Sequence, residues 1–83
     1  MSLAKYVKFR EEKFGGVLFE TRSEKVFTLN EVAAAVVREI KAGCDEREIV
    51  ARLKARYEDR EESIERDVSA FIAQLREKGL IQD

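Results

Sequence analysis

The side chains that could take part in chemistry are few in kind: one cysteine, Cys44, and 17 aspartates and glutamates, with no histidine. Without histidine or a second cysteine, the chain has no set of nitrogen and sulfur ligands for zinc. It also lacks the base of a Ser–His or Cys–His nucleophile pair. Cys44 directly follows Gly43 and is interpreted as a small packed side chain rather than a reactive thiol.

The many carboxylates leave open a catalytic role, because two of them could pair as general acid and general base. They fall instead on the outer faces of predicted helices with lysine or arginine nearby, which is typical of solvated i, i+4 pairs. The sequence has no glycine-rich phosphate loop and no metal-ligand spacing. We therefore predict a protein that is not an enzyme and uses no cofactor.

The composition predicts one small domain that spans residues 1–83. Hydrophobic residues make up 45% and charged residues 40%, which is typical of a folded chain with amphipathic helices. The net charge of −1 gives no strong field to attract nucleic acid or anionic lipid. The longest apolar run, 32–37, is too short to cross a bilayer, and the first residues do not resemble a signal peptide. We expect a cytoplasmic protein.

The first third of the chain alternates between apolar and polar residues, which predicts three β-strands. These strands are expected at 6–10, 17–21 and 25–29. Gly15-Gly16 is predicted to form a turn that needs positive φ. In the third strand, alternation places Phe27 and Leu29 toward the core. Because the connections are short, we expect an antiparallel meander.

The rest of the chain predicts three helices that together cover one face of this sheet. Asn30 is a good N-cap, and the D-x-x-E patterns at 45–48 and 59–62 are similar to capping boxes. Gly79, after Lys78, is typical of a Schellman stop. Apolar residues recur at helical spacing at Ala33, Val36, Val37 and Ile40, at Ile49, Val50, Leu53 and Tyr57, and at Ile64, Val68, Phe71, Ile72 and Leu75. The predicted fold class is α+β, a three-stranded antiparallel β-meander followed by three α-helices.

Two segments carry a family resemblance. They are FTLNEVAAAV at 27–36 and IERDVSAFIAQLREKGL at 64–80, separated by a short helix with an acidic cap. In this order they resemble the PqqD family, also called the RiPP recognition element. The resemblance extends from about Val7 to Ile81.

The resemblance implies a winged helix-turn-helix-like domain that acts as a peptide chaperone. Family members bind the leader segment of a ribosomally made precursor peptide. The leader adds as a strand to the edge of the third strand, against the third helix. The domain then presents the peptide to a partner, often a radical S-adenosylmethionine (radical SAM) enzyme, and in the founding pathway the product is pyrroloquinoline quinone. Segment 13–18 departs from the founding members and looks more like PqqD-like proteins of other peptide-modification clusters.

The site implied by this resemblance joins a strand edge to a helix face. Strand addition needs an open row of backbone N–H and C=O groups, and Lys25, Val26, Phe27 and Thr28 can supply it if their strand is an edge. On a helical wheel, a seam flanks the apolar stripe of the third helix, with Phe71 as an apolar wall and Ala70 leaving room for a peptide side chain. This seam consists of Ser63, Asp67, Ala70 and Gln74. Asp67 and Gln74 could position a basic or polar leader group.

Other interpretations stand beside this one. Each seam residue alone could be an ordinary solvated helix residue, and Lys25 could serve only to keep the edge from aggregating. A winged-helix DNA-binding protein is the main alternative, although acidic residues on the third helix would face the phosphates. A homodimer could also form by pairing the same edge with itself. We expect a precursor peptide and a modifying enzyme as partners, and neither nucleic acid nor a membrane.

Overall fold

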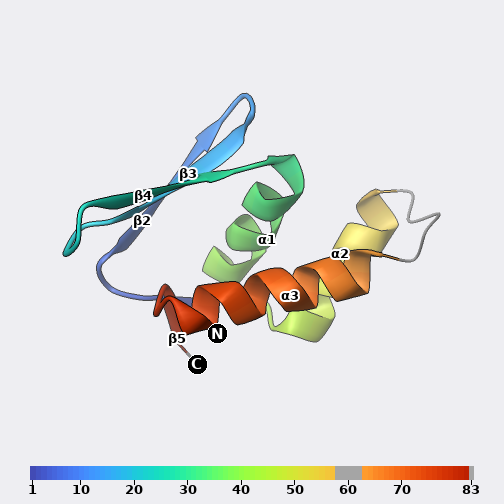
Figure 1. Cartoon of the computed structure of the whole chain (residues 1–83). Helices are drawn as coiled ribbons and strands as arrows, with labels where there is room; N and C mark the ends of the chain where they lie inside the picture. The colour runs from blue at the N-terminus through green and yellow to red at the C-terminus, as the bar shows by residue number, and fades with distance from the viewer. Residues whose placement is uncertain (58–62, 83) are drawn as a thin grey trace.

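Alternating apolar residues near the N-terminus form a three-stranded antiparallel sheet, as the sequence predicts (Figure 1). The computed structural model describes residues 1–57 and 63–82. The strands are β2 (Val7–Glu12), β3 (Gly15–Glu20) and β4 (Lys25–Leu29), in the order β2-β3-β4. The third predicted strand has the bounds expected from the sequence. The other two begin or end within two residues of the prediction.

The register of the sheet separates its two faces. Phe9, Leu18 and Phe27 lie side by side in one cross-strand row, with Leu18 fully buried. Phe19 pairs with Val26 in the next row, on the opposite face of the sheet. The prediction that Leu29 belongs to the core is confirmed, whereas Phe27 is half-buried and packs at the border of the core.

The prediction of a turn at Gly15-Gly16 is wrong by two residues. Glu12 pairs with Gly15, so Lys13 and Phe14 form the turn and both glycines belong to β3. Gly15 does have a positive φ of 146°, but the reason for glycine is space. A Cβ on Gly15 would lie 2.3 Å from the backbone oxygen of Leu29. Gly15 therefore allows the end of β4 to pass close to β3, and neither glycine belongs to the turn itself.

Three helices follow, and the first two begin at the predicted caps. They are α1 (Glu31–Lys41), α2 (Glu46–Arg56) and α3 (Ile64–Glu77). The Asn30 side chain accepts a hydrogen bond of 2.8 Å from the N–H of Ala33. Asp45 and Glu48 form the predicted capping box at the start of α2.

The predicted end of α3 is confirmed, whereas the capping pattern predicted for its start cannot be compared with the structure. The D-x-x-E pattern at 59–62 lies outside the described residues, and the N-cap of α3 is Ser63. At the other end, the N–H of Leu80 donates to the carbonyl of Leu75 at 2.9 Å, and the N–H of Gly79 donates to Arg76. This pair of bonds is the predicted Schellman motif, and it fixes where the chain leaves α3.

The three helices do not lie side by side on the face of the sheet (Figure 1). α1 packs directly on β3 and β4, whereas α2 packs against α1 and α3. The expectation that three helices share one face of the sheet is therefore wrong, since a sheet of three short strands offers room for little more than α1. The core lies between the sheet and the helices and includes Leu18, Val37, Ile40, Ile49, Leu53, Val68, Ile72 and Leu80, all at most 1% exposed.

A second, two-stranded sheet escaped prediction. β1 (Ser2–Leu3) pairs antiparallel with β5 (Ile81–Gln82). The Tyr6 hydroxyl adds a hydrogen bond of 2.8 Å to the carbonyl of Gly79. Two residues give no periodicity, so neither strand could be recognised from the sequence. Among the described residues, no helix is long and apolar enough to span a membrane.

Candidate functional site

β4 forms one edge of the three-stranded sheet. In the described part of the chain its pairing partner is β3, and its other side is open. Lys25, Val26 and Thr28 are exposed there, and Phe27 is half-buried. An edge strand presents alternate N–H and C=O groups outward. The condition stated for Lys25 to Thr28, that their strand is an edge, is thus met by the order of the sheet.

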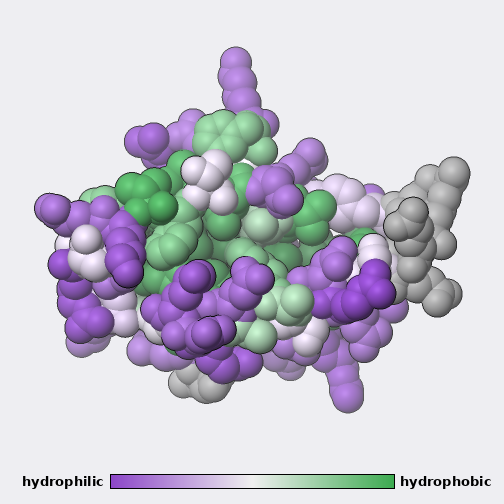
Figure 2. Space-filling model, viewed as in Figure 1, coloured by the Kyte–Doolittle hydropathy of each residue, from purple (hydrophilic) through white to green (hydrophobic). Residues whose placement is uncertain are grey.

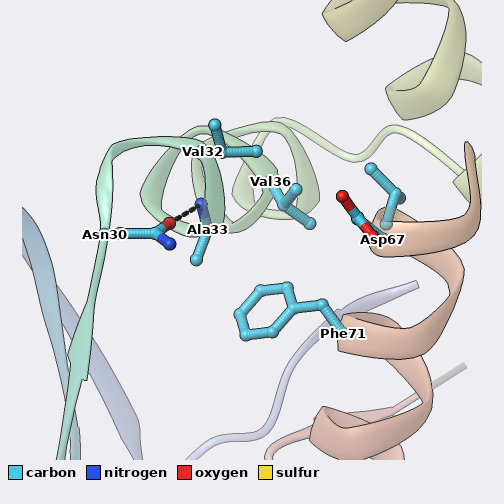
Figure 3. A pocket seen from close by; sticks show the side chains of 7 residues that line it. Asn30, Val32, Ala33, Val36, Asp67 and Phe71 are labelled. Atoms are coloured by element: carbon cyan, nitrogen blue, oxygen red, sulfur yellow. Dashed lines mark hydrogen bonds between the residues drawn. The ribbon is translucent and has the colours of Figure 1, made fainter. Parts of the chain in front are cut away.

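A pocket of about 320 Å³ opens next to the end of β4, between the first turns of α1 and the first half of α3 (Figure 3). Figure 3 shows Phe71 reaching from α3 toward the start of α1, with Asp67 one turn earlier on the same helix. The small side chain of Ala33 leaves space on the opposite wall. The pocket is lined by Asn30, Val32, Ala33, Val36, Asp67, Val68 and Phe71.

The surface around this pocket is hydrophobic in the middle and hydrophilic at its borders. Figure 2 shows hydrophobic residues gathered between the sheet and α3, with hydrophilic residues around them. Val32 contributes to this surface with 38% of its area exposed, although valine is usually buried. The pocket and the open edge of β4 together are called the β4–α3 groove below.

The structure places one residue of the predicted seam, Asp67, at the pocket beside Phe71, the predicted apolar wall. Asp67 and Phe71 line the pocket, as expected for residues one turn apart. Ser63 lies half-buried at the N-cap, outside the lining of the pocket. Ala70 and Gln74 are exposed and also lie outside this lining. A contact of these three residues with a peptide stays a prediction.

Sequence reasoning missed the wall that α1 contributes. Val32 and Val36 line the pocket, whereas the sequence assigned Val36 to the apolar stripe of its helix and gave Val32 no role. Val36 is almost fully buried. Its side chain packs in the core and also lines the pocket between α1 and α3. The one signal available was Val32, an apolar residue in the first turn that falls outside the i, i+3, i+4 stripe of its helix.

Sequence reasoning also missed Lys78. Its Nζ lies 5.8 Å from the centroid of the Phe27 ring, so the end of α3 reaches the middle of β4. Asp67 and Lys78 are eleven residues apart, which separates them by about 16 Å along a helix axis. The groove therefore has a carboxylate near one end, an ammonium group near the other and aromatic surface between. Gln74 shares the helix face of Phe71 and Lys78 by its spacing.

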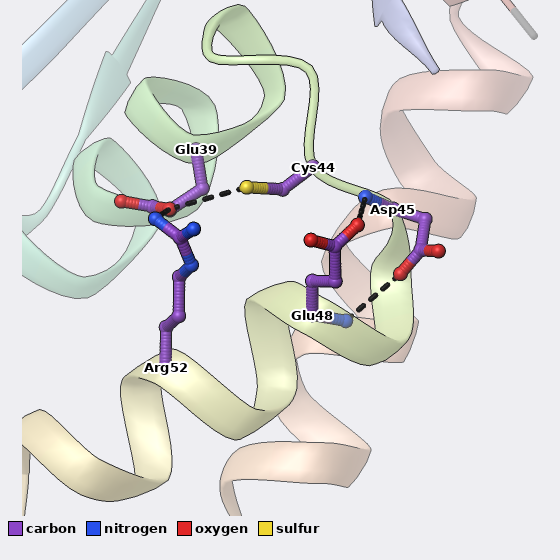
Figure 4. Close-up of polar contacts among 5 residues, drawn as sticks. All are labelled: Glu39, Cys44, Asp45, Glu48 and Arg52. Carbon is purple, nitrogen blue, oxygen red and sulfur yellow. Dashed lines mark hydrogen bonds and ion pairs between the residues drawn. The ribbon is translucent and has the colours of Figure 1, made fainter.

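Cys44 lies away from the groove, in the core (Figure 4). Its Sγ donates to Glu39 Oε2 at 3.5 Å, and the same oxygen pairs with Arg52 Nη1 at 2.9 Å. Burial first, and then this hydrogen bond, raise the pKa of the Cys44 thiol. The interpretation as a small packed side chain is confirmed by its burial. Residues 1–57 and 63–82 contain no cluster of three or more potential metal ligands.

This α+β fold, with its element order and an open strand edge beside α3, places the protein in the class of winged helix-turn-helix-like domains. A family model described as "Coenzyme PQQ synthesis protein D (PqqD)" matches residues 15–81. The chain therefore belongs to the PqqD family, as the sequence resemblance implied.

Two solved structures share this fold over nearly the whole chain. One is described as "Lasso peptide synthetase B1 complexed with the leader peptide", with a TM-score of 0.83, 27% identity and coverage of 98% of this chain and 95% of that chain. The other is described as "TbiB1 in Complex with the TbiA(beta) Leader Peptide", with a TM-score of 0.86, 24% identity and full coverage of both chains. A comparison with curated proteins found no match.

Proposed function

We propose that this protein binds the leader segment of a ribosomally synthesised precursor peptide and presents the peptide to a modifying enzyme, without performing catalysis itself. The observation that carries the proposal is the β4–α3 groove, where an open strand edge runs beside an apolar pocket. The proposed contacts are Lys25, Val26, Phe27, Thr28, Ser63, Asp67, Ala70, Phe71 and Gln74.

In the groove, backbone groups would supply affinity and side chains would supply specificity. Backbone hydrogen bonds along β4 would hold any extended peptide with little demand on its sequence. The pocket would add specificity, because an apolar leader side chain could displace water from the surface of Phe71 and Val32. Asp67, at the rim of the pocket, suits a basic or polar group of the leader.

Family membership and the solved structures support this function. The structure at 27% identity is described as a complex with a leader peptide. Its description names a lasso peptide synthetase. The radical SAM partner implied by the family resemblance stays a prediction. Co-purification with the enzymes encoded beside the gene would identify the class of partner.

An NMR titration tests the proposal directly. Synthetic N-terminal segments of the short peptides encoded beside the gene are added to ¹⁵N-labelled protein. We expect amide shifts along 25–28 and around Phe71. The other edge strand, β2, is an internal control because it does not border the pocket. Peptides that shift neither region, or that shift β2 instead, would contradict the proposed site.

A further inference from the structure

The outer face of the sheet, which points away from α1, has solvent-exposed apolar side chains. Phe19 is 37% exposed and Val26 is 58% exposed. A half-buried Val17 lies beside them on the same face. The three residues line a hollow of about 470 Å³, together with Lys8, Phe9 and Arg10. A sheet with one solvated face usually carries polar residues on it, so this patch needs an explanation.

The patch reaches the open edge of the sheet. Phe19 on β3 pairs directly with Val26 on β4, so the apolar row ends at the edge strand. A strand added to β4 would place one of its own side chains directly opposite Val26. Such cross-strand neighbours have Cβ atoms about 4.5–5.5 Å apart, close enough to pack.

The edge of β4 is therefore apolar on both faces. Toward the helices, Phe27 lies at the edge and Phe71 lines the adjoining pocket. Away from the helices, Val26 continues the row of Phe19. A strand that contacts apolar surface on both faces has a continuous run of apolar residues in its sequence, instead of alternating apolar and polar residues.

We propose that the leader segment bound by this protein carries a β-branched or aromatic residue opposite Val26, next to the residue that faces the pocket. The recognised segment is then a run of consecutive apolar residues, with adjacent side chains on the two faces of the added strand. This inference rests on the proposed function and adds a specificity position on the outer face. The occupant is the leader strand, because the row of Phe19 and Val26 is continuous with the β4–α3 groove.

The test selects from a displayed library of fully randomised 12-residue peptides on the intact protein. Selected peptides are titrated against the wild-type protein, Val26→Thr and the matched control Val17→Thr. Both substitutions keep a β-branched shape and change one methyl group to a hydroxyl on the same face. Val17 lies one strand further from the edge, opposite Thr28.

We expect Val26→Thr to weaken binding of the selected peptides about two- to fivefold, as for the loss of one cross-strand apolar pair. Val17→Thr should change affinity less than twofold. Cross-strand contacts in NMR spectra should place a β-branched or aromatic peptide residue opposite Val26, and changing that residue to serine should cause the same loss.

The outcomes separate this inference from the proposed function. Peptides that shift the β4 amides but bind Val26→Thr as well as wild type, or that carry polar residues opposite Val26, overturn the inference alone. A selection with no peptide that shifts the β4 amides overturns both. Protein that forms a dimer broken by Val26→Thr assigns the surface to a second copy and also overturns the inference.

Discussion

The ammonium group of Lys78 lies 5.8 Å from the centroid of the Phe27 ring and so joins the end of α3 to the middle of β4. A similar contact exists at the other edge of the sheet, where Lys41 Nζ lies 5.9 Å from the centroid of the Phe9 ring on β2. The two pairs have the same chemistry and nearly the same distance, but only the first borders the β4–α3 groove. This difference makes them a matched test of the groove.

We expect Lys78→Gln to weaken leader binding about two- to fivefold, because it removes a cation–π contact beside the docked strand. Lys41→Gln should leave leader affinity unchanged. Each variant should lose at most about 1 kcal/mol of unfolding free energy. Titration calorimetry and urea denaturation give the two quantities. Equal losses of affinity in both variants would show that Lys78 acts through the fold and not through the groove.

Asp67→Arg should weaken leader binding about three- to tenfold, because a long cationic side chain would enter the pocket beside Phe71 and reverse its charge. The fold should stay intact, since Asp67 is exposed. Glu65→Arg is the control: it makes the same charge change in the same turn of α3 and costs only an exposed pair with Lys54. Calorimetry that finds the same affinity for Asp67→Arg and wild type would remove Asp67 from the site.

Gly15→Ala should lower the unfolding free energy by at least about 2 kcal/mol, through strain at positive φ and a clash with the backbone of Leu29. Gly43→Ala is the comparison, because Gly43 also has a positive φ of 91° but no atom lies within 4 Å of an added Cβ. Its cost should be about 1 kcal/mol. Urea unfolding curves measure both. Equal costs would mean that the close approach of β3 to the end of β4 is easily relaxed.

The raised pKa of Cys44 predicts a loss of stability at alkaline pH. In the unfolded chain the thiol ionises near about pH 8.5, whereas in the folded protein it keeps its proton to higher pH. The contribution of the protonated thiol to the free energy of unfolding is therefore complete below about pH 8.5. It is lost as pH rises through the pKa of the folded protein. Thermal melts from pH 7 to 10 should fall more steeply for wild type than for Cys44→Ala. Parallel curves for the two proteins would show that the thiol titrates alike in both states.

The sequence predicted the parts of the fold that local chemistry determines. Residues 25–29 were bounded correctly because alternation ends where Asn30 caps the next helix. The capping box at 45–48 and the Schellman stop at Gly79 were equally readable. Each of these signals is complete within a few neighbouring residues, so no tertiary contact was needed to interpret it.

What the sequence could not predict depends on neighbours distant in the chain. Gly15 and Gly16 indicate a turn when only local conformation is considered, yet the backbone at Leu29 is what excludes a side chain at Gly15. The α1 wall of the pocket depends on how α1 and α3 pack, and the same holds for the contact between Lys78 and Phe27. Asp67 and Phe71, which line the pocket, were predicted because the family resemblance joined the edge of the third strand to the third helix.

The pairing of Ser2 with Gln82 places the two ends of the chain next to each other, as Figure 1 also shows. A short glycine-serine linker could therefore join the ends, and the ring could be reopened at the Lys13-Phe14 turn. The circularly permuted protein would keep β4 and α3 unbroken. New termini at that hairpin tip would carry a fluorophore or a fused enzyme near the end of β4, where Asn30 lines the pocket.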